Sequence, residues 1–167
     1  ALPRNLALRL VKEEARGVES VVYFADDDNL YTASLLEKLR RVERVGVFGI
    51  AFNPAVGQRG GRWIEHGHFA YPLCDSDKRV WGFHTRWVGD DRPQESDTAR
   101  RFAVDISQFA VNSKYLFDRP HDVLFDTSWS SGRAEDNFLK AVLAHVTNPL
   151  AALEVLDDDA DACKPPR

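Results

Sequence analysis

The sequence predicts an α/β domain, because apolar runs of strand length alternate with a segment of helical periodicity. Residues 21–24 (Val-Val-Tyr-Phe) are apolar on both faces, as a buried strand is. Residues 34–41 carry leucines at helical spacing, and residues 45–52 form a second apolar run. This order predicts two parallel strands joined by a helix. A length of 167 residues predicts one domain.

Composition and charge exclude several classes of protein. The chain is 44% hydrophobic and 29% charged, which is ordinary for a globular domain. Its net charge of −4 argues against binding to nucleic acid, which requires a basic face. No apolar run is long enough to cross a bilayer, and no signal peptide opens the sequence. We therefore expect neither nucleic acid nor a membrane as a partner of this segment.

Other elements follow from local patterns. Residues 4–17 predict an amphipathic helix that ends near Gly17, and Thr32 is placed to cap the helix over residues 34–41. Residues 53–61 are rich in Gly and polar residues and predict a loop. Residues 80–87 predict a strand, and Glu135 opens a helix with apolar residues inside.

Three carboxylates stand where the first strand ends, at Asp26, Asp27 and Asp28, followed by Asn29. Adjacent negative charges cannot be buried unpaired, so we expect a cation there. A hard divalent ion with oxygen ligands fits this chemistry, and ligands of open α/β sheets bind at the carboxyl ends of strands. The alternative is a solvated turn that precedes the next helix.

Two further sets of metal-ligand residue types give weaker signals. His66 and His68 lie near Glu65 on one short strand, but no third zinc ligand is evident. Cys74 and Cys163 have no metal-ligand spacing, and the sequence leaves open whether they pair or stay free.

Several motifs resemble the inverting β-1,3-glucuronosyltransferases, in that family's order and at about its spacing. The first is residues 23–29 (Tyr-Phe-Ala-Asp-Asp-Asp-Asn), which is similar to the family's Asp-x-Asp region. The others are residues 80–87 (Val-Trp-Gly-Phe-His-Thr-Arg-Trp), 102–105 (Phe-Ala-Val-Asp) with 109–112 (Phe-Ala-Val-Asn), and 125–127 (Phe-Asp-Thr). The resemblance spans nearly the whole chain.

The resemblance implies a GT-A-like mixed sheet flanked by helices, with a donor site around the acidic turn. It implies Mn²⁺ held mainly by Asp28, with Asp26 and Asp27 contacting the ribose or metal-bound water of a UDP-sugar. Arg4 matches an arginine that helps to bind the nucleotide. Without the resemblance, Arg4 reads equally well as an exposed arginine at a helix start.

The resemblance also implies an acceptor site and a catalytic base. Glu65, Arg100 and Asp105 match residues that contact the acceptor sugar, although Arg100 and Asp105 could instead form a structural ion pair. Glu135 matches the base, in a motif where Asp136 and Asn137 replace two serines. Its alternative role is to stabilise the first turn of its helix.

The chain departs from the family at both ends. Most of the family's nucleotide-binding strands are missing, so residues 1–156 are expected to form about the last two-thirds of a catalytic domain. Residues 157–167 diverge and could be disordered, with Asp159 and Asp161 where the family has a histidine and an arginine.

The implied function is Mn²⁺-dependent inverting transfer of glucuronic acid from UDP-glucuronic acid to a galactose-terminated glycan. Alternatives are a truncated, inactive member that acts as a binding or structural protein, and a relative that uses UDP-xylose. Family resemblance further implies a homodimer in the Golgi lumen, anchored to the membrane only through an N-terminal helix that this chain lacks.

Overall fold

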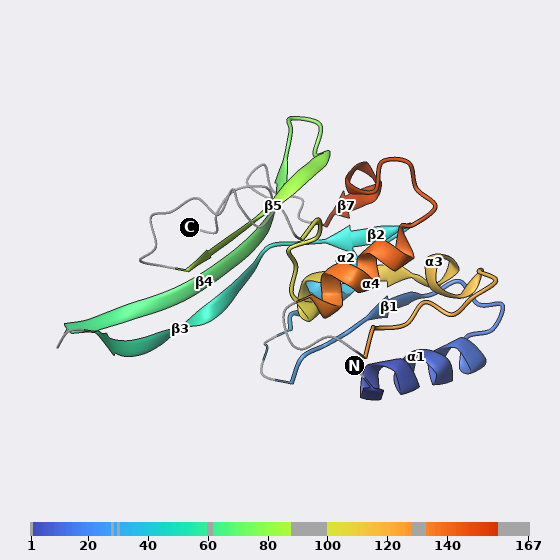
Figure 1. Cartoon of the computed structure of the whole chain (residues 1–167), viewed down its shortest axis with the longest axis horizontal. Helices are drawn as coiled ribbons and strands as arrows, with labels where there is room; N and C mark the ends of the chain where they lie inside the picture. The colour runs from blue at the N-terminus through green and yellow to red at the C-terminus, as the bar shows by residue number, and fades with distance from the viewer. Residues whose placement is uncertain are drawn as a thin grey trace.

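The computed structural model describes residues 2–27, 29, 31–59, 62–87, 100–127 and 133–156, and their side chains except those of residues 51–70 and 84–87. Four α-helices, seven strands and two 3₁₀ turns lie in this part of the chain (Figure 1). In order they are α1 Leu2–Glu14, β1 Val21–Tyr23, α2 Ala33–Leu39, β2 Val45–Val47, β3 Ile50–Arg59, β4 Arg62–Cys74, β5 Val80–Trp87, η1 Ile106–Gln108, β6 Phe109–Asn112, α3 Ser113–Phe117, α4 Ala134–Val142, η2 Leu150–Ala152 and β7 Leu153–Val155.

The central sheet is mixed, with the strand order β1-β6-β2-β7. β1 and β2 both pair antiparallel with β6, and β7 pairs parallel with β2. Because β1 and β2 are each antiparallel to the strand between them, they run parallel to one another. This confirms the predicted strand–helix–strand unit, with β6 inserted between its two strands.

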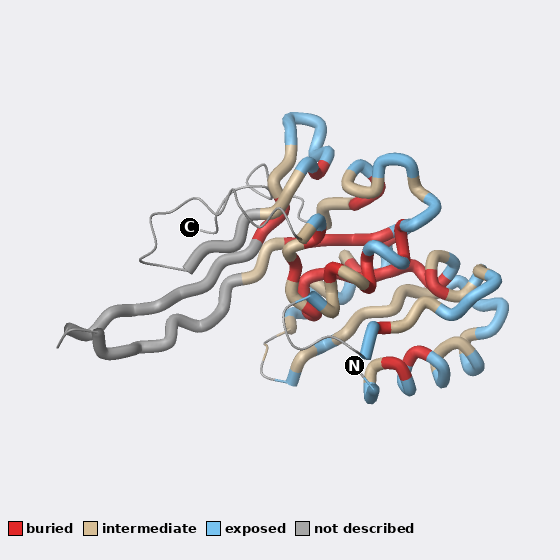
Figure 2. The backbone as a smooth tube through the Cα atoms, in the orientation of Figure 1, coloured by how far each residue is buried: buried red, intermediate tan, exposed pale blue. Residues whose placement is uncertain are grey.

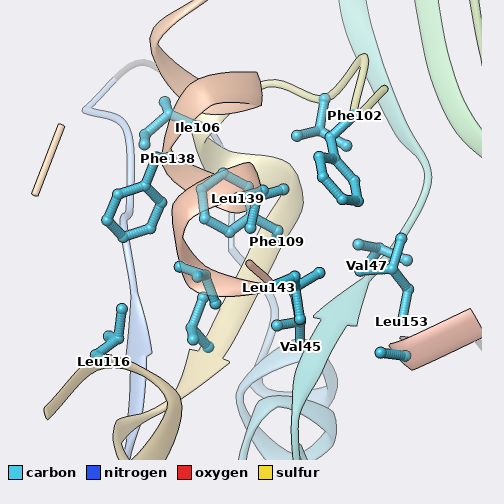
Figure 3. Close-up of a cluster of buried hydrophobic side chains, with 14 of the residues drawn as sticks. Val45, Val47, Phe102, Ile106, Phe109, Leu116, Phe138, Leu139, Leu143 and Leu153 are labelled. Carbon is cyan, nitrogen blue, oxygen red and sulfur yellow. The ribbon is translucent and has the colours of Figure 1, made fainter. Parts of the chain in front are cut away.

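Side chains alternate between the two faces of this sheet, and each face has its own core. Phe109 and Val111 of β6 join the larger core with Val45, Val47 and α4, whereas Ala110 points into a smaller core beneath α2. Figure 3 shows Phe138 and Leu139 of α4, and Leu143 directly after it, packed over β6 and β2. The sheet is therefore covered by helices on both faces, as the sequence predicts.

Buried residues are concentrated at β2, β6 and α4 (Figure 2). All four residues of β6 are buried, while the three residues of β1, at the edge of the sheet, are only half-buried. The strand predicted at residues 21–24 is therefore confirmed at Val21–Tyr23, but the prediction that it is buried is wrong. An apolar sequence on both faces does not distinguish an edge strand covered by helices from a central one.

A second, antiparallel sheet of order β3-β4-β5 extends from the body as a long hairpin with β5 alongside (Figure 1). It corrects two predictions. The apolar run 45–52 divides into β2 and the start of β3. These two strands belong to different sheets. The loop predicted at residues 53–61 is mostly strand, since β3 continues to Arg59 and pairs with β4, with a bulge between Phe52 and Ala55. Cross-strand pairing overrides the low strand propensity of this stretch.

The remaining predictions of elements hold. α1 ends at Glu14, three residues before Gly17, whose φ is +76°. Thr32 caps α2 by accepting a hydrogen bond from the Leu35 amide at 3.2 Å. α4 begins one residue before Glu135, and β5 spans Val80–Trp87 as predicted.

Cys74, at the end of β4, is disulfide-bonded, which answers the question that the sequence left open for this residue. In the described part of the chain, no helix is long and apolar enough to cross a membrane. The predicted tail, residues 157–167, lies outside the described residues.

Candidate functional site

A cluster of phenylalanines brings together the segments that carry the predicted site residues. Phe125 and Phe138 stack in parallel with their ring centroids 4.1 Å apart, and Phe24 meets both edge-on at 5.3 and 6.0 Å. Phe24 lies two residues before Asp26, and Phe138 lies three residues after Glu135. The acidic turn and the start of α4 are therefore anchored on the same group of rings.

Asp26 is held by the phenol of Tyr31. The Tyr31 hydroxyl donates to the Asp26 carbonyl at 2.7 Å and accepts from the Asp26 amide. These two bonds use the Asp26 backbone and leave its half-buried carboxylate available. Asp27, the next residue, is exposed. Among the described residues, the carboxylates of Asp26 and Asp27 therefore take no part in the hydrogen bonds of the turn.

Asp105 is linked to this turn through Ser107. The Asp105 carboxylate accepts from the Ser107 amide at 3.2 Å and from its hydroxyl at 3.1 Å, and it caps η1. The Asn29 side chain in turn donates to the Ser107 hydroxyl at 3.0 Å. The predicted acceptor residue and the predicted metal-binding turn are therefore two hydrogen bonds apart.

Tyr23 reports on the charge in this region. Its hydroxyl donates to the Ser107 carbonyl at 2.9 Å. Burial raises the pKa of Tyr23 well above its ordinary value, and Tyr31 and the nearby carboxylates of Asp105 and Asp26 raise it further. Two of the predicted site carboxylates thus act on the hydroxyl of one half-buried tyrosine.

Glu135 pairs with Arg4 across 131 positions of sequence. The guanidinium Nη1 lies 3.2 Å from the Glu135 Oε1, and the two side chains are 35% and 18% exposed. The Arg4 guanidinium also lies 5.6 Å from the centroid of the Phe125 ring. The predicted base and the predicted nucleotide-binding arginine therefore share one location, at the first turn of α4.

The donor set of the turn suits a hard divalent cation. The described residues give Asp26, Asp27 and Asp105 no ion-pair partner, so their charges are not neutralised by a side chain that the structure describes. Carboxylate oxygens are ligands that Mn²⁺ and Mg²⁺ accept. Among the described residues no three metal-ligand side chains form a ready-made cluster.

Some predicted site residues fall outside these findings. Asp28, the predicted metal ligand, and the side chain of Glu65, on β4, lie outside the described residues, as do the side chains of His66 and His68. Arg100 lies five residues before Asp105.

Three residues of the site region escape prediction from sequence. Asn5 is buried in α1, and its side-chain amide donates to the Phe125 carbonyl at 2.8 Å and accepts from the Phe125 amide at 2.7 Å. Ser107 bridges Asp105 and Asn29, and Asp136 is a buried carboxylate on α4. Only Asp136 left a signal, as a charged residue within the apolar periodicity of a helix.

A mixed sheet covered by helices on both faces, with carboxylates beyond the end of a strand, is consistent with a GT-A-like glycosyltransferase domain. The chain belongs to glycosyltransferase family 43, whose model matches residues 1–160.

The chain is similar to several named relatives. It is 30% identical over 156 residues to galactosylgalactosylxylosylprotein 3-beta-glucuronosyltransferase P of Drosophila melanogaster, covering 93% of this chain and 26% of the relative. It is 35% identical over 133 residues to the human enzyme named 3-beta-glucuronosyltransferase 3, covering 80% and 32%. It is 31% identical over 153 residues to the sqv-8 enzyme of Caenorhabditis elegans, covering 90% and 37%. The chain thus spans between a quarter and two-fifths of the length of these relatives.

Proposed function

We propose that this chain supplies the acceptor site and the catalytic base of a glucuronosyltransferase, which transfers glucuronic acid from UDP-glucuronic acid to a galactose-terminated glycan. The observation that carries the proposal is the common anchoring of the acidic turn and Glu135 on the stacked phenylalanines. Membership of glycosyltransferase family 43 and similarity to proteins named 3-beta-glucuronosyltransferases support the choice of reaction.

In this reaction Glu135 takes the proton from the attacking acceptor hydroxyl. The hydroxyl oxygen bonds to the anomeric carbon as the bond from that carbon to the UDP oxygen breaks, with inversion at the carbon. A single displacement requires one base and no protein nucleophile. Positioning of the two sugars then contributes as much as the proton transfer.

Asp28, with Asp26 and Asp27 beside it, would hold Mn²⁺. The ion, when bound, would neutralise charge on the diphosphate of the leaving UDP. Arg4 would alternate between Glu135, which it contacts in the structure, and the donor diphosphate, which has the stronger charge. Arg100, Asp105 and Glu65 would bind hydroxyls of the acceptor.

The same proposal includes a cellular location. The disulfide at Cys74 favours an oxidising compartment, which agrees with the Golgi lumen that the family resemblance implies. A homodimer belongs to this proposal as well, and sedimentation measurements would test it.

A transfer assay with UDP-glucuronic acid, a galactose-terminated disaccharide and Mn²⁺ tests the base. We expect Glu135→Gln to lower the rate by about 100-fold or more, because an amide cannot accept the proton. This variant should still bind UDP, as measured by titration calorimetry with and without Mn²⁺. Glu14→Gln, on the exposed face of α1, is the matched control and should transfer at the wild-type rate.

Equal rates for wild type and Glu135→Gln would remove Glu135 as the base. A wild-type chain that neither transfers sugar nor binds UDP in a metal-dependent way would contradict the enzymatic proposal and favour a binding role. The rate of transfer from UDP-xylose, tested as a second donor, distinguishes the xylose-using alternative from a glucuronosyltransferase.

A further inference from the structure

Asp136 is a buried carboxylate that joins two segments of the proposed site. Its side chain is 1% exposed, and its Oδ1 accepts a hydrogen bond from the Phe102 amide at 2.8 Å. Its Oδ2 accepts from the Lys140 ammonium group, one helical turn further along α4. Phe102 itself is 1% exposed, so water does not substitute for the carboxylate at its amide.

The position of Asp136 on α4 explains how a charge is tolerated there. Asp136 is the third residue of α4, within the first turn, where the free backbone N–H groups give the helix a partial positive charge. The helix terminus, the Phe102 amide and Lys140 together stabilise the carboxylate. A buried carboxylate held by three such partners keeps one orientation, because any other would leave a charge unpaired.

The two segments that Asp136 connects carry different parts of the proposed chemistry. Glu135, the proposed base, directly precedes Asp136 on α4. Arg100 lies two residues before Phe102, and Asp105 lies three residues after it. The hydrogen bond from Phe102 to Asp136 is therefore a direct link between the segment proposed to bind the acceptor and the helix proposed to activate it.

We propose that Asp136 is a positioning residue for the acceptor: it fixes the segment of residues 100–105 against the start of α4, so that a bound sugar hydroxyl meets Glu135. Asp136 itself touches neither substrate. This inference rests on the proposed function. It assigns a role that the sequence comparison does not, since the corresponding position in the resembling motif is a serine.

Kinetics of three variants test the proposal. Asp136→Asn keeps an oxygen that accepts from the Phe102 amide and should leave the acceptor KM within about threefold of wild type. Asp136→Ala removes the link and should raise the acceptor KM by about tenfold or more, with a lower kcat and an unchanged donor KM. Asp75→Ala is the matched control, because the Asp75 carboxylate also accepts from two backbone amides, in the exposed turn between β4 and β5. It should leave both KM values unchanged.

Hydrogen exchange of the Phe102 amide separates this proposal from the proposed function. The amide should exchange slowly in wild type and Asp136→Asn, and at least about tenfold faster in Asp136→Ala. If the wild-type chain neither transfers sugar nor binds UDP in a metal-dependent way, the proposed function fails. Unaltered exchange in Asp136→Ala would overturn the link between Asp136 and Phe102 independently. If Asp136→Ala does not fold, Asp136→Ser takes its place, since its shorter side chain weakens the same contact.

Two kinetic results would also overturn the proposal. One is an acceptor KM in Asp136→Ala equal to that of wild type. The other is a parallel change in donor and acceptor KM, which is the result expected if Asp136 only stabilises the fold.

Discussion

Tyr23 shows how a single side chain couples the fold to the charge of the site. Its hydroxyl donates to the Ser107 carbonyl, and its ring meets that of Tyr31 edge-on with the centroids 5.9 Å apart. The negative charges of the Asp105 and Asp26 carboxylates also act on this hydroxyl, so the phenolate form is strongly disfavoured in the folded protein. The neutral phenol is therefore part of the native structure.

Replacing Tyr23 by Phe should make the stability of the protein less dependent on alkaline pH. The pKa of Tyr23 is raised on folding, so its contribution is fully present below the unfolded pKa of about 10 and is lost as pH rises above it. At pH 8 the variant should be about 1 kcal/mol less stable, because it lacks one hydrogen bond. Urea denaturation at pH 8, 9.5 and 10.5 measures the difference.

That difference between wild type and Tyr23→Phe should shrink as the pH increases. Because the two proteins differ only at residue 23, effects of alkaline pH that are common to both cancel in this difference. A difference that stays constant or grows with pH would show that Tyr23 is not held neutral by its surroundings.

At the residue scale, the sequence predicts which residue types carry the chemistry of the site better than it predicts which residues contact one another. The residue types of Asp26 and Glu135 predicted a carboxylate at the end of a strand and another at a helix start, and both are found there. The bond between Arg4 and Glu135 joins residues 131 positions apart, and no local pattern encodes it. Asn5 reads as an ordinary polar residue of an amphipathic helix until its partner, the Phe125 backbone, is known.

β2 owes its place in the sheet to a glycine between two valines. Val45 and Val47 point into the larger core, and Gly46 faces Val42 and Leu156 on the other side. A Cβ at Gly46 would lie 2.7 Å from Val42 Cγ2 and 2.8 Å from Leu156 Cδ1. The chain that follows α2 therefore packs directly on the β2 backbone.

Gly46→Ala should destabilise the protein by about 1–3 kcal/mol, because the added methyl group overfills a closely packed site. Val42 is 2% exposed and β-branched, so it has little freedom to move aside. Chemical denaturation gives the free energy of unfolding. Gly82→Ala is the control, since its Cβ would come no closer than 3.8 Å to Leu73 and should change stability by less than about 0.5 kcal/mol. Equal effects at the two glycines would contradict this account.

Elements with strong local signals were predicted well, and elements defined by pairing were not. Thr32 caps α2 and the leucines of α2 follow helical spacing, so both signals lie within a few residues. Residues 53–59 are strand only because β4 lies beside them. The split of residues 45–52 between two sheets depends in the same way on distant partners, β6 and β7 for one half and β4 for the other.

The whole molecule is organised around β6, which lies between β1 and β2 in the sheet and between two cores. Its four residues are all buried. Opening β6 requires separation of both neighbouring strands and of the layers above and below, so its amides should exchange only on global unfolding.

Native-state hydrogen exchange should therefore find the slowest amides in β6. Amides of β1, at the edge of the sheet and half-buried, should exchange through smaller local openings at least about tenfold faster. Exchange of β1 as slow as that of β6 would contradict this order of stability.

The two hydrogen bonds between the Asn5 side chain and the Phe125 backbone have a consequence for synthesis of the chain on the ribosome. α1 is made before residue 125, with Leu2, Leu6 and Leu10 exposed even in the finished fold, and the Asn5 side chain lacks its Phe125 partner until residue 125 has been made. Glu135 follows only ten positions later. A polypeptide that stops before residue 125 therefore carries an exposed apolar helix and lacks the proposed base. α1 and the proposed base are joined in one fold only after residue 135 has been made.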